Sequence, residues 1–183
     1  MIAAVLSELK ALKKELHQAG VRKSAHRLAA GRSKLAMKIE QIPSADTLNL
    51  RSKVLRPGKP ISTCHFDGDD APQTRHFGAL NHQDQIVGIV SVYQQGNASI
   101  SAHNPYQLRA MAIDTSARGQ GIGVLLLNAA ESYLQSCGCD RVWANARTVA
   151  LGFYTKQDYK VLSEEFVIEN VGPHYLVAKS LAG

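Results

Sequence analysis

The sequence predicts an α/β domain, in which strands and helices alternate along the chain. Its 183 residues, 45% of them apolar, are enough for about one domain with a sizeable core. An apolar, strand-like run at 108–113 leads into a glycine-rich turn at 118–123, which opens an uninterrupted helical run at 124–134. A strand, a glycine turn and a helix in direct succession are typical of an α/β unit.

The individual elements follow from hydrophobic periodicity and from chain-breaking residues. A first strand at 38–42 is stopped by Pro43, and Ser44 or Asp46 can cap a helix that runs to about Leu55. The remaining predicted elements are a polar, partly acidic loop at 61–73, a hairpin of strands at 75–81 and 85–94, a central strand at 106–114, the helix at 124–134, a strand at 141–146, a helix that opens at 150–154, and closing strands at 160–169 and 174–180.

The glycine turn has the composition of an anion site. Its residues are Arg118, Gly119, Gln120, Gly121, Ile122 and Gly123. Such a turn presents unpaired backbone N–H groups and the positive end of the helix dipole at one point. Glycines allow backbone conformations that a Cβ would hinder and let a phosphate approach the main chain. Arg118 adds a fixed positive charge.

Spacing excludes two common phosphate sites. A P-loop requires Lys followed by Ser or Thr at its end, whereas Ile122, Gly123 and Val124 follow Gly121 here. The dinucleotide fingerprint requires glycine at Val124 and an acid at the end of the next strand, but the nearest acid, Asp140, precedes that strand.

What remains is the pattern R/Q-x-x-G-x-G/A. At Arg118, Gly121 and Gly123 the turn resembles the pyrophosphate-binding turn of the GNAT superfamily of N-acetyltransferases. A second segment, with Asn145, Ala150, Phe153, Tyr154 and then Asp158-Tyr159, is similar to the superfamily's N…A-x-x-F-Y-x-x-x-G-F pattern. Asp158 replaces the family's glycine, which predicts a slightly costlier left-handed helix end.

The resemblance covers about residues 37–183 and implies the GNAT fold. That fold has a mixed central sheet, splayed between its fourth and fifth strands, with helices on both faces. It implies acetyl-CoA as the co-substrate, bound in the splay. The residues that would contact it are Met111, Ala112 and Ile113 through their backbone, Arg118 to Gly123 at the pyrophosphate, and Asn145 and Tyr154 from the other side. A main-chain N–H of the fourth strand would polarise the thioester carbonyl.

The same resemblance implies direct attack of a neutral amine on the thioester, with no covalent enzyme intermediate. Tyr154 matches the family's acid position and would protonate the leaving thiolate; the alternative is that it only packs on the cofactor sulfur. The general base is open among several His and Glu residues, with His174 ranked first: His65, His76, His103, His174, Glu164, Glu165 and Glu169. Three acids of the polar loop, Asp67, Asp69 and Asp70, either attract a cationic amine or form a solvated loop.

Composition limits the other classes. The net charge of +6 comes from residues 1–36, which hold eight of the 21 Lys and Arg and two of the 15 Asp and Glu, so residues 37–183 are neutral. This argues against a nucleic-acid partner. No apolar run approaches the roughly 18 residues of a membrane span. Cys64, Cys137 and Cys139 form neither a disulfide framework nor a metal motif, so we expect plain thiols in the cytoplasm and no metal.

Residues 1–36 are predicted to be a basic, amphipathic N-terminal extension to an acetyltransferase domain at 37–183. The alternatives are that Met37 is the functional start, or that the extension binds a membrane surface or directs targeting. Three functions stay open for the whole chain. They are an N-acetyltransferase acting on a small-molecule or protein amine, with a homodimer as one candidate assembly; a non-catalytic acyl-CoA-binding regulatory module; and a nucleotide-binding protein.

Overall fold

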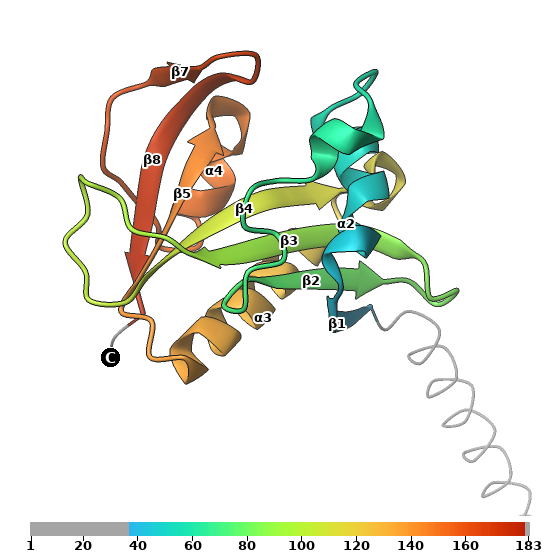
Figure 1. Ribbon diagram of the computed structural model, residues 1–183, viewed down its shortest axis with the longest axis horizontal. Coiled ribbons are helices and arrows are strands. Elements are labelled where there is room, and N and C mark those ends of the chain that lie inside the picture. Colours follow the sequence, from blue (N-terminus) through green and yellow to red (C-terminus); the bar gives the residue numbers. More distant parts are fainter. Residues whose placement is uncertain (1–36, 182–183) are drawn as a thin grey trace, which may run out of the picture. The chain divides into compact units, whose positions relative to one another are not determined.

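A computed structural model describes residues 37–181. These residues form an eight-stranded mixed sheet in the order β1-β2-β3-β4-β5-β8-β6, with β7 paired to β8 (Figure 1). The strands are β1 (Lys38–Ile42), β2 (Arg75–Leu80), β3 (Ile86–Gln94), β4 (Pro105–Ile113), β5 (Arg141–Arg147), β6 (Lys160–Val161), β7 (Phe166–Ile168) and β8 (Gly172–Ser180). The helices are α2 (Ser44–Leu50), α3 (Ile122–Ser136) and α4 (Leu151–Thr155), with shorter segments η1 (Arg51–Leu55), η2 (Ile61–Cys64), η3 (Thr115–Ala117) and η4 (Thr148–Ala150).

Helices cover both faces of the sheet, as the sequence predicts. The α3 helix packs on β1 to β4, and its buried stripe joins one core cluster with Val90, Val92 and Leu108. On the other face α2 and η1 pack against Ile89 and Ala112. Because strand side chains alternate between faces, the two clusters take alternate residues of β3. The strands therefore have one face toward α3 and another toward α2 and η1.

The first helix differs from its prediction. It ends as an α-helix at Leu50 and continues as a π-helical turn to Leu55, in which the N–H of Arg56 donates to the carbonyl of Arg51. Neither predicted cap forms: Pro43 is the N-cap residue, and Asp46 lies within the first turn of the helix. The hydroxyl of Ser44 donates to Asp70 at 2.5 Å instead of accepting a backbone N–H. The cap prediction was therefore wrong.

The predicted strand at 160–169 is two short strands, β6 and β7, that both pair with β8. Between them the backbone N–H of Leu176 donates to the hydroxyl of Ser163 at 2.9 Å. The side chain of Ser163 thus takes the place of a main-chain acceptor of the neighbouring strand, and the strand is interrupted there. The left-handed helix end at Asp158 is confirmed, with φ of 66°.

Candidate active site

The central feature of the site is the divergence of β4 from β5 (Figure 1). These parallel strands pair only at their beginnings, where residues 105–107 lie opposite residues 141–143. Beyond Gln107, β4 is paired only with β3, on its other edge. The sheet is therefore splayed between its fourth and fifth strands, and backbone polar groups of β4 face the splay.

A bulge interrupts β4 inside the splay. The register with β3 shifts between Ile89 and Ser91, and Ala110 has φ of 53°. A positive φ is uncommon for a residue with a Cβ and is often found at functional sites. Such a bulge changes the direction of the neighbouring backbone N–H groups. The sequence gives no sign of it, because alanine is not a typical left-handed residue.

The glycine turn joins η3 to α3. Gly119 and Gly121 have φ of 76° and 75°, and Gly121 is the N-cap of α3. Within residues 37–181, the N–H groups from Arg118 to Gly123 donate no backbone hydrogen bond. Unpaired donors at the positive end of a helix of 15 residues form an anion-binding geometry.

Gly123 has a different reason to be glycine. It lies inside α3, and a Cβ there would be 3.2 Å from Cε2 of Phe153. The missing side chain thus lets α3 and α4 approach each other. The glycine-turn pattern and the pattern around Phe153 and Tyr154 meet at this contact, since Phe153 and Tyr154 both belong to α4.

Tyr154 is buried on the α3 side of the sheet, among Phe153 and Tyr159. Its hydroxyl lies 3.7 Å from the Sδ atom of Met111, a β4 residue within the splay. Burial raises the pKa of Tyr154 to about 12. The phenol is therefore protonated at neutral pH and can donate a hydrogen bond into the splay.

Asn145 does not share a face with Tyr154. It alternates with Ala144 and Ala146, which pack in the same core cluster as Tyr154. Asn145 belongs instead to the α2 face, with Trp143. The sequence could not distinguish the faces, because the phase of a short buried strand is set by its pairing.

His174 also lies on the α2 face, where it is buried opposite Arg147 in the β5–β8 register. Its ring stacks on Phe166 with centroids 6.2 Å apart. The Nδ1 atom is 2.7 Å from the carbonyl of Gly172, to which it can only donate. In a neutral ring this assigns the lone pair to Nε2, which can then accept a proton.

The other candidate bases have different surroundings. His76 is buried between the hydroxyl of Ser91 and the carbonyl of Asp69, and burial lowers its pKa. His65 is exposed beside Asp70. The backbone of His103 is held by Asp140, which precedes β5, where β4 and β5 are still paired. The remaining exposed candidates are Glu164, Glu165 and Glu169.

The interpretation of the polar loop as solvated is wrong at Asp69. This carboxylate is fully buried and accepts two hydrogen bonds from Arg51, at 2.6 and 3.0 Å. It also accepts from the hydroxyl of Tyr93 and the backbone N–H of Phe66. Burial alone would raise the pKa of Asp69, but these donors outweigh it and lower the pKa to about 2. Asp69 is thus committed to Arg51 and is not free to attract an amine.

Sequence reasoning missed this network. Arg51, Ser91 and Tyr93 come from η1 and β3, and each lies on the α2 face. The available signal was in β3, where Ser91 and Tyr93 alternate with Val90 and Val92. Polar residues at alternate positions of a buried strand indicate a buried polar partner, but they do not say which.

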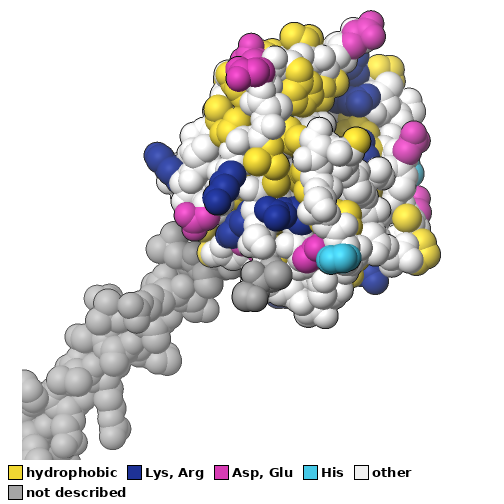
Figure 2. Space-filling view, turned by 90° about the vertical axis from the view of Figure 1, so that its left-hand side faces the viewer, with side chains coloured by type: hydrophobic (Ala, Val, Ile, Leu, Met, Phe, Trp, Pro, Cys, Tyr) yellow, Lys and Arg dark blue, Asp and Glu magenta, His cyan; other side chains and the backbone are white. Residues whose placement is uncertain are grey.

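The surface of the described residues carries both signs of charge. Figure 2 shows a face on which hydrophobic side chains form a band with Lys and Arg beside it and Asp and Glu at its margins. Among residues 37–181, no helix has the length and apolarity needed to cross a membrane. In the same span no three His, Cys, Asp or Glu side chains are grouped to hold a metal ion. Residues 1–36, and the predictions made for them, lie outside the described part of the chain.

Comparison with known proteins agrees with this geometry. Residues 42–159 match the model of the acetyltransferase (GNAT) family. The uncharacterized N-acetyltransferase YitI of Bacillus subtilis is 32% identical over 145 residues, which are 79% of this chain and 97% of that protein. Among solved structures, Ard1 from Thermoplasma volcanium superposes with a TM-score of 0.65 and 14% identity, over 81% of this chain and 100% of that one. An aminoglycoside 6'-N-acetyltransferase complexed with coenzyme A superposes with a TM-score of 0.60 and 16% identity, over 80% of this chain and 98% of that one.

Proposed function

Because this chain belongs to the GNAT acetyltransferase family, and is therefore an acyl-CoA-dependent acyltransferase, we propose that it transfers an acetyl group from acetyl-CoA to an amine by direct attack. The observation that carries the proposal is the splay of β4 from β5. A glycine turn with free N–H groups follows β4, and the hydroxyl of Tyr154 lies beside β4 within the splay.

The cofactor arm would lie along β4. The backbone of Met111, Ala112 and Ile113 would bind its amide groups, and the turn from Arg118 to Gly123 would bind its pyrophosphate. This assignment is supported by the missing β5 partner of β4 beyond Gln107. It is also supported by a relative of the same fold that was solved with coenzyme A. A backbone N–H near the Ala110 bulge would stabilise the oxyanion that forms on the thioester carbonyl.

The reaction requires two proton movements. The amine nitrogen bonds to the thioester carbon, the carbon–sulfur bond breaks, and the sulfur leaves as a thiolate. We assign the donor to Tyr154. Its pKa of about 12 exceeds that of an ordinary thiol, about 8.5, so its main role is a strong hydrogen bond to the departing thiolate. When the proton moves to the sulfur, the phenolate of Tyr154 regains a proton from solvent.

We assign the base to His174. Its Nδ1–H is held by Gly172, so Nε2 is oriented as an acceptor for the proton that the amine loses. His174 and Tyr154 lie on opposite faces of the sheet. An amine that reaches the thioester from the α2 face would therefore meet the base first, while the thiolate leaves toward the donor. Asn145, on the face of His174, would contact the acceptor or the thioester end of the cofactor.

The test is calorimetric titration of the purified full chain with acetyl-CoA, ATP and NAD, followed by thiol release in the same preparation with a panel of amines. Binding of acetyl-CoA with amine-dependent thiol release supports the proposal. Binding without release from any amine would favour the alternative, a non-catalytic acyl-CoA-binding regulatory module. Absence of CoA binding would overturn the assignment of the glycine turn. A cytoplasmic location and a homodimer stay predictions.

A further inference from the structure

The ring of Phe66 is surrounded by cations. Three guanidinium carbons lie near its centroid, at 4.5, 4.9 and 5.3 Å, and they belong to Arg51, Arg56 and Arg109. These residues come from η1, the position after it and β4. Each contact is a favourable cation–π interaction. Three like charges around one ring also repel each other, so the cluster needs compensating negative charge.

Only one of the three cations is compensated among residues 37–181. Arg51 pairs with the buried carboxylate of Asp69. No carboxylate of the described residues lies within 4.0 Å of the guanidinium of Arg56 or Arg109. Both side chains are half-buried, and Arg109 also lies 4.8 Å from the ring of Tyr93. Aromatic rings therefore hold these two cations, while their N–H donors are left for another partner.

The uncompensated cations lie at the splay. Arg109 is two residues beyond Gln107, the last β4 residue paired with β5. On the same face, Nη2 of Arg147, the last residue of β5, lies 3.5 Å from the carbonyl oxygen of Leu55. Leu55 directly precedes Arg56, so this contact links the end of β5 to the Phe66 cluster. Arg147 is in turn opposite His174 in the β5–β8 register. The proposed base and the cations therefore share the α2 face.

We propose that the acceptor amine carries an anionic group, a carboxylate or a phosphate, which Arg56 and Arg109 bind. This inference rests on the proposed acetyl transfer and specifies its substrate class. Guanidinium groups bind carboxylate and phosphate oxygens in a bidentate manner, which fixes orientation as well as position. Bound in this way, the anion directs the amino group of the acceptor toward His174 and the thioester. The anion also supplies the charge that the Phe66 cluster lacks.

The first experiment compares matched acceptors. Thiol release is measured with each of the common amino acids, with the corresponding amino-acid amides, and with aminoalkyl phosphates and the parent amino alcohols. We expect kcat/KM to be about 10- to 100-fold higher for the anionic member of a pair, the range of one or two charge-assisted hydrogen bonds. The carboxylate and phosphate arms identify which anion is used. Equal use of neutral and anionic members would overturn the inference.

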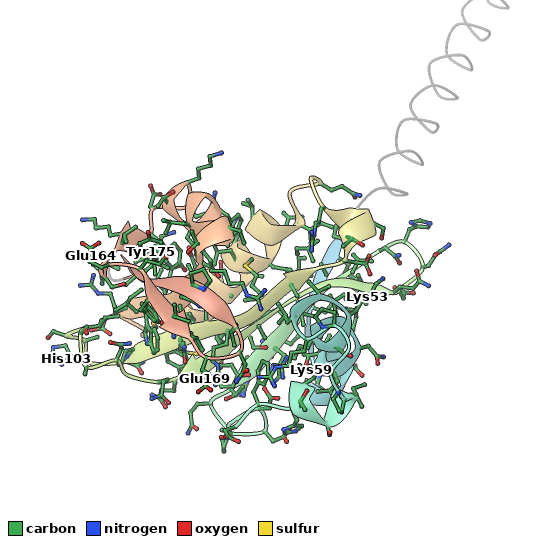
Figure 3. All side chains as sticks on the ribbon, turned by 90° about the horizontal axis from the view of Figure 1, so that it is seen from above. Lys53, Lys59, His103, Glu164, Glu169 and Tyr175 are labelled. Atoms are coloured by element: carbon green, nitrogen blue, oxygen red, sulfur yellow. The ribbon has the colours of Figure 1, made fainter. Side chains whose placement is uncertain are left out.

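The second experiment assigns the preference to residues. In Arg109→Gln and in Arg56→Gln, the preference for anionic over neutral acceptors should fall by about 10-fold or more, while the Kd for acetyl-CoA changes less than about 2-fold. The control is Lys59→Gln, which removes the same charge from the exposed η1–η2 connection (Figure 3). It should leave the preference unchanged. If both arginine variants keep the full preference, the cations are not the acceptor site.

A third readout separates this inference from the proposed function. Binding of the amino acids and aminoalkyl phosphates of the first experiment is measured by calorimetry in the presence of CoA, which requires no turnover. Loss of this binding in Arg109→Gln supports the anion site even if Tyr154 has no catalytic role. Arg109→Lys, which keeps the charge but not the planar fork, covers the case in which Arg109→Gln fails to fold. Full anion binding in Arg109→Lys and Arg56→Gln alike would overturn the inference.

Discussion

The hydroxyl of Tyr154, on α4, lies 3.7 Å from the Sδ atom of Met111, on β4. Tyr154 lies in the helix that follows β5, and Met111 belongs to β4. Because β4 and β5 diverge, this contact crosses the splay on the α3 side. A thioether is a weak acceptor. The phenol therefore has a poor partner where a thiolate would be a good one.

Tyr154→Phe should lower kcat by about 100-fold, in the range that a general acid contributes. The Kd for acetyl-CoA should change less than about 3-fold, and the free energy of unfolding by less than about 1 kcal/mol, because only a weak hydrogen bond is lost. Thiol release, calorimetry and urea unfolding measure the three quantities. An unchanged kcat would leave Tyr154 with a packing role only.

The ratio of wild-type to Tyr154→Phe activity should be constant with pH. Since burial raises the pKa of Tyr154 to about 12, the phenol keeps its proton through the alkaline range in which free tyrosine titrates. Activity profiles of the two proteins from about pH 7 to about pH 10 should therefore be parallel. A ratio that falls toward 1 with an apparent pKa near 9 would contradict a buried, protonated donor.

Gly121→Ala and Gly138→Ala form a matched pair. Both glycines have positive φ, 75° and 69°, and at both positions a Cβ would meet no atom within 4 Å. Each substitution should lower the free energy of unfolding by about 1 kcal/mol through the left-handed conformation. Only Gly121→Ala should weaken acetyl-CoA binding, because Gly121 caps α3 at the proposed pyrophosphate site. Equal affinity in the two variants would argue against that site.

Asp69→Asn should destabilise the domain by about 3–5 kcal/mol, because it leaves the buried charge of Arg51 uncompensated. Asp70→Asn is the control, since its exposed carboxylate contacts Ser44 and His65; it should cost less than about 1 kcal/mol. Urea unfolding measures both. A cost for Asp69→Asn as small as that of the control would contradict the buried ion pair.

The same ion pair predicts that the free energy of unfolding falls at acid pH. The folded pKa of Asp69, about 2, lies below its ordinary value of 3.8, so its contribution is fully present above about pH 4. It is lost as the pH falls from about 4 toward 2. This part of the acid dependence should be absent in Asp69→Asn.

Ala110→Gly and Ala110→Val test the β4 bulge. Glycine removes a left-handed cost of about 1–2 kcal/mol but adds chain entropy worth about 0.5–1 kcal/mol to the unfolded state, so stability should be unchanged or slightly higher. Valine at φ of 53° should lower stability by about 1–3 kcal/mol. We also expect Ala110→Val to lower kcat, because the proposed oxyanion donor is a backbone N–H near this bulge. If Ala110→Val leaves the stability unchanged, the backbone at residue 110 must be able to leave the left-handed conformation, which would contradict a fixed bulge.

Local sequence patterns predicted much of the fold and the cofactor side of the candidate site. The hairpin of β2 and β3, the central strand, the glycine turn and α3 each depend on residues within a few positions of each other, so periodicity and glycine placement were sufficient. The interruption after β6 was missed, because it depends on Ser163 replacing a ladder partner of Leu176, 13 residues away. Pairing of this kind leaves no local signature.

The acceptor side was the least predictable. Arg51 meets Asp69, Ser91 and Tyr93 across 18, 40 and 42 positions, and the sequence around each residue is ordinary. Phe66 lies in a segment read as a polar loop, yet it gathers guanidinium groups from η1 and β4. Only the folded sheet, which brings these segments to one face, identifies the cluster.

Short sequence motifs were enough to predict the family, the glycine turn that opens α3, and the place of Tyr154 in the next helical segment. The family follows from a resemblance between short motifs. The conformation of the turn follows from short-range sterics and helix-end electrostatics, which act between neighbours in the chain. Three features became visible only in the folded domain: the face that each β5 residue takes, the bulge at Ala110, and the pairing of Arg51 with Asp69. Strand register and burial set these features, and both depend on contacts between segments that meet only when the whole domain has folded.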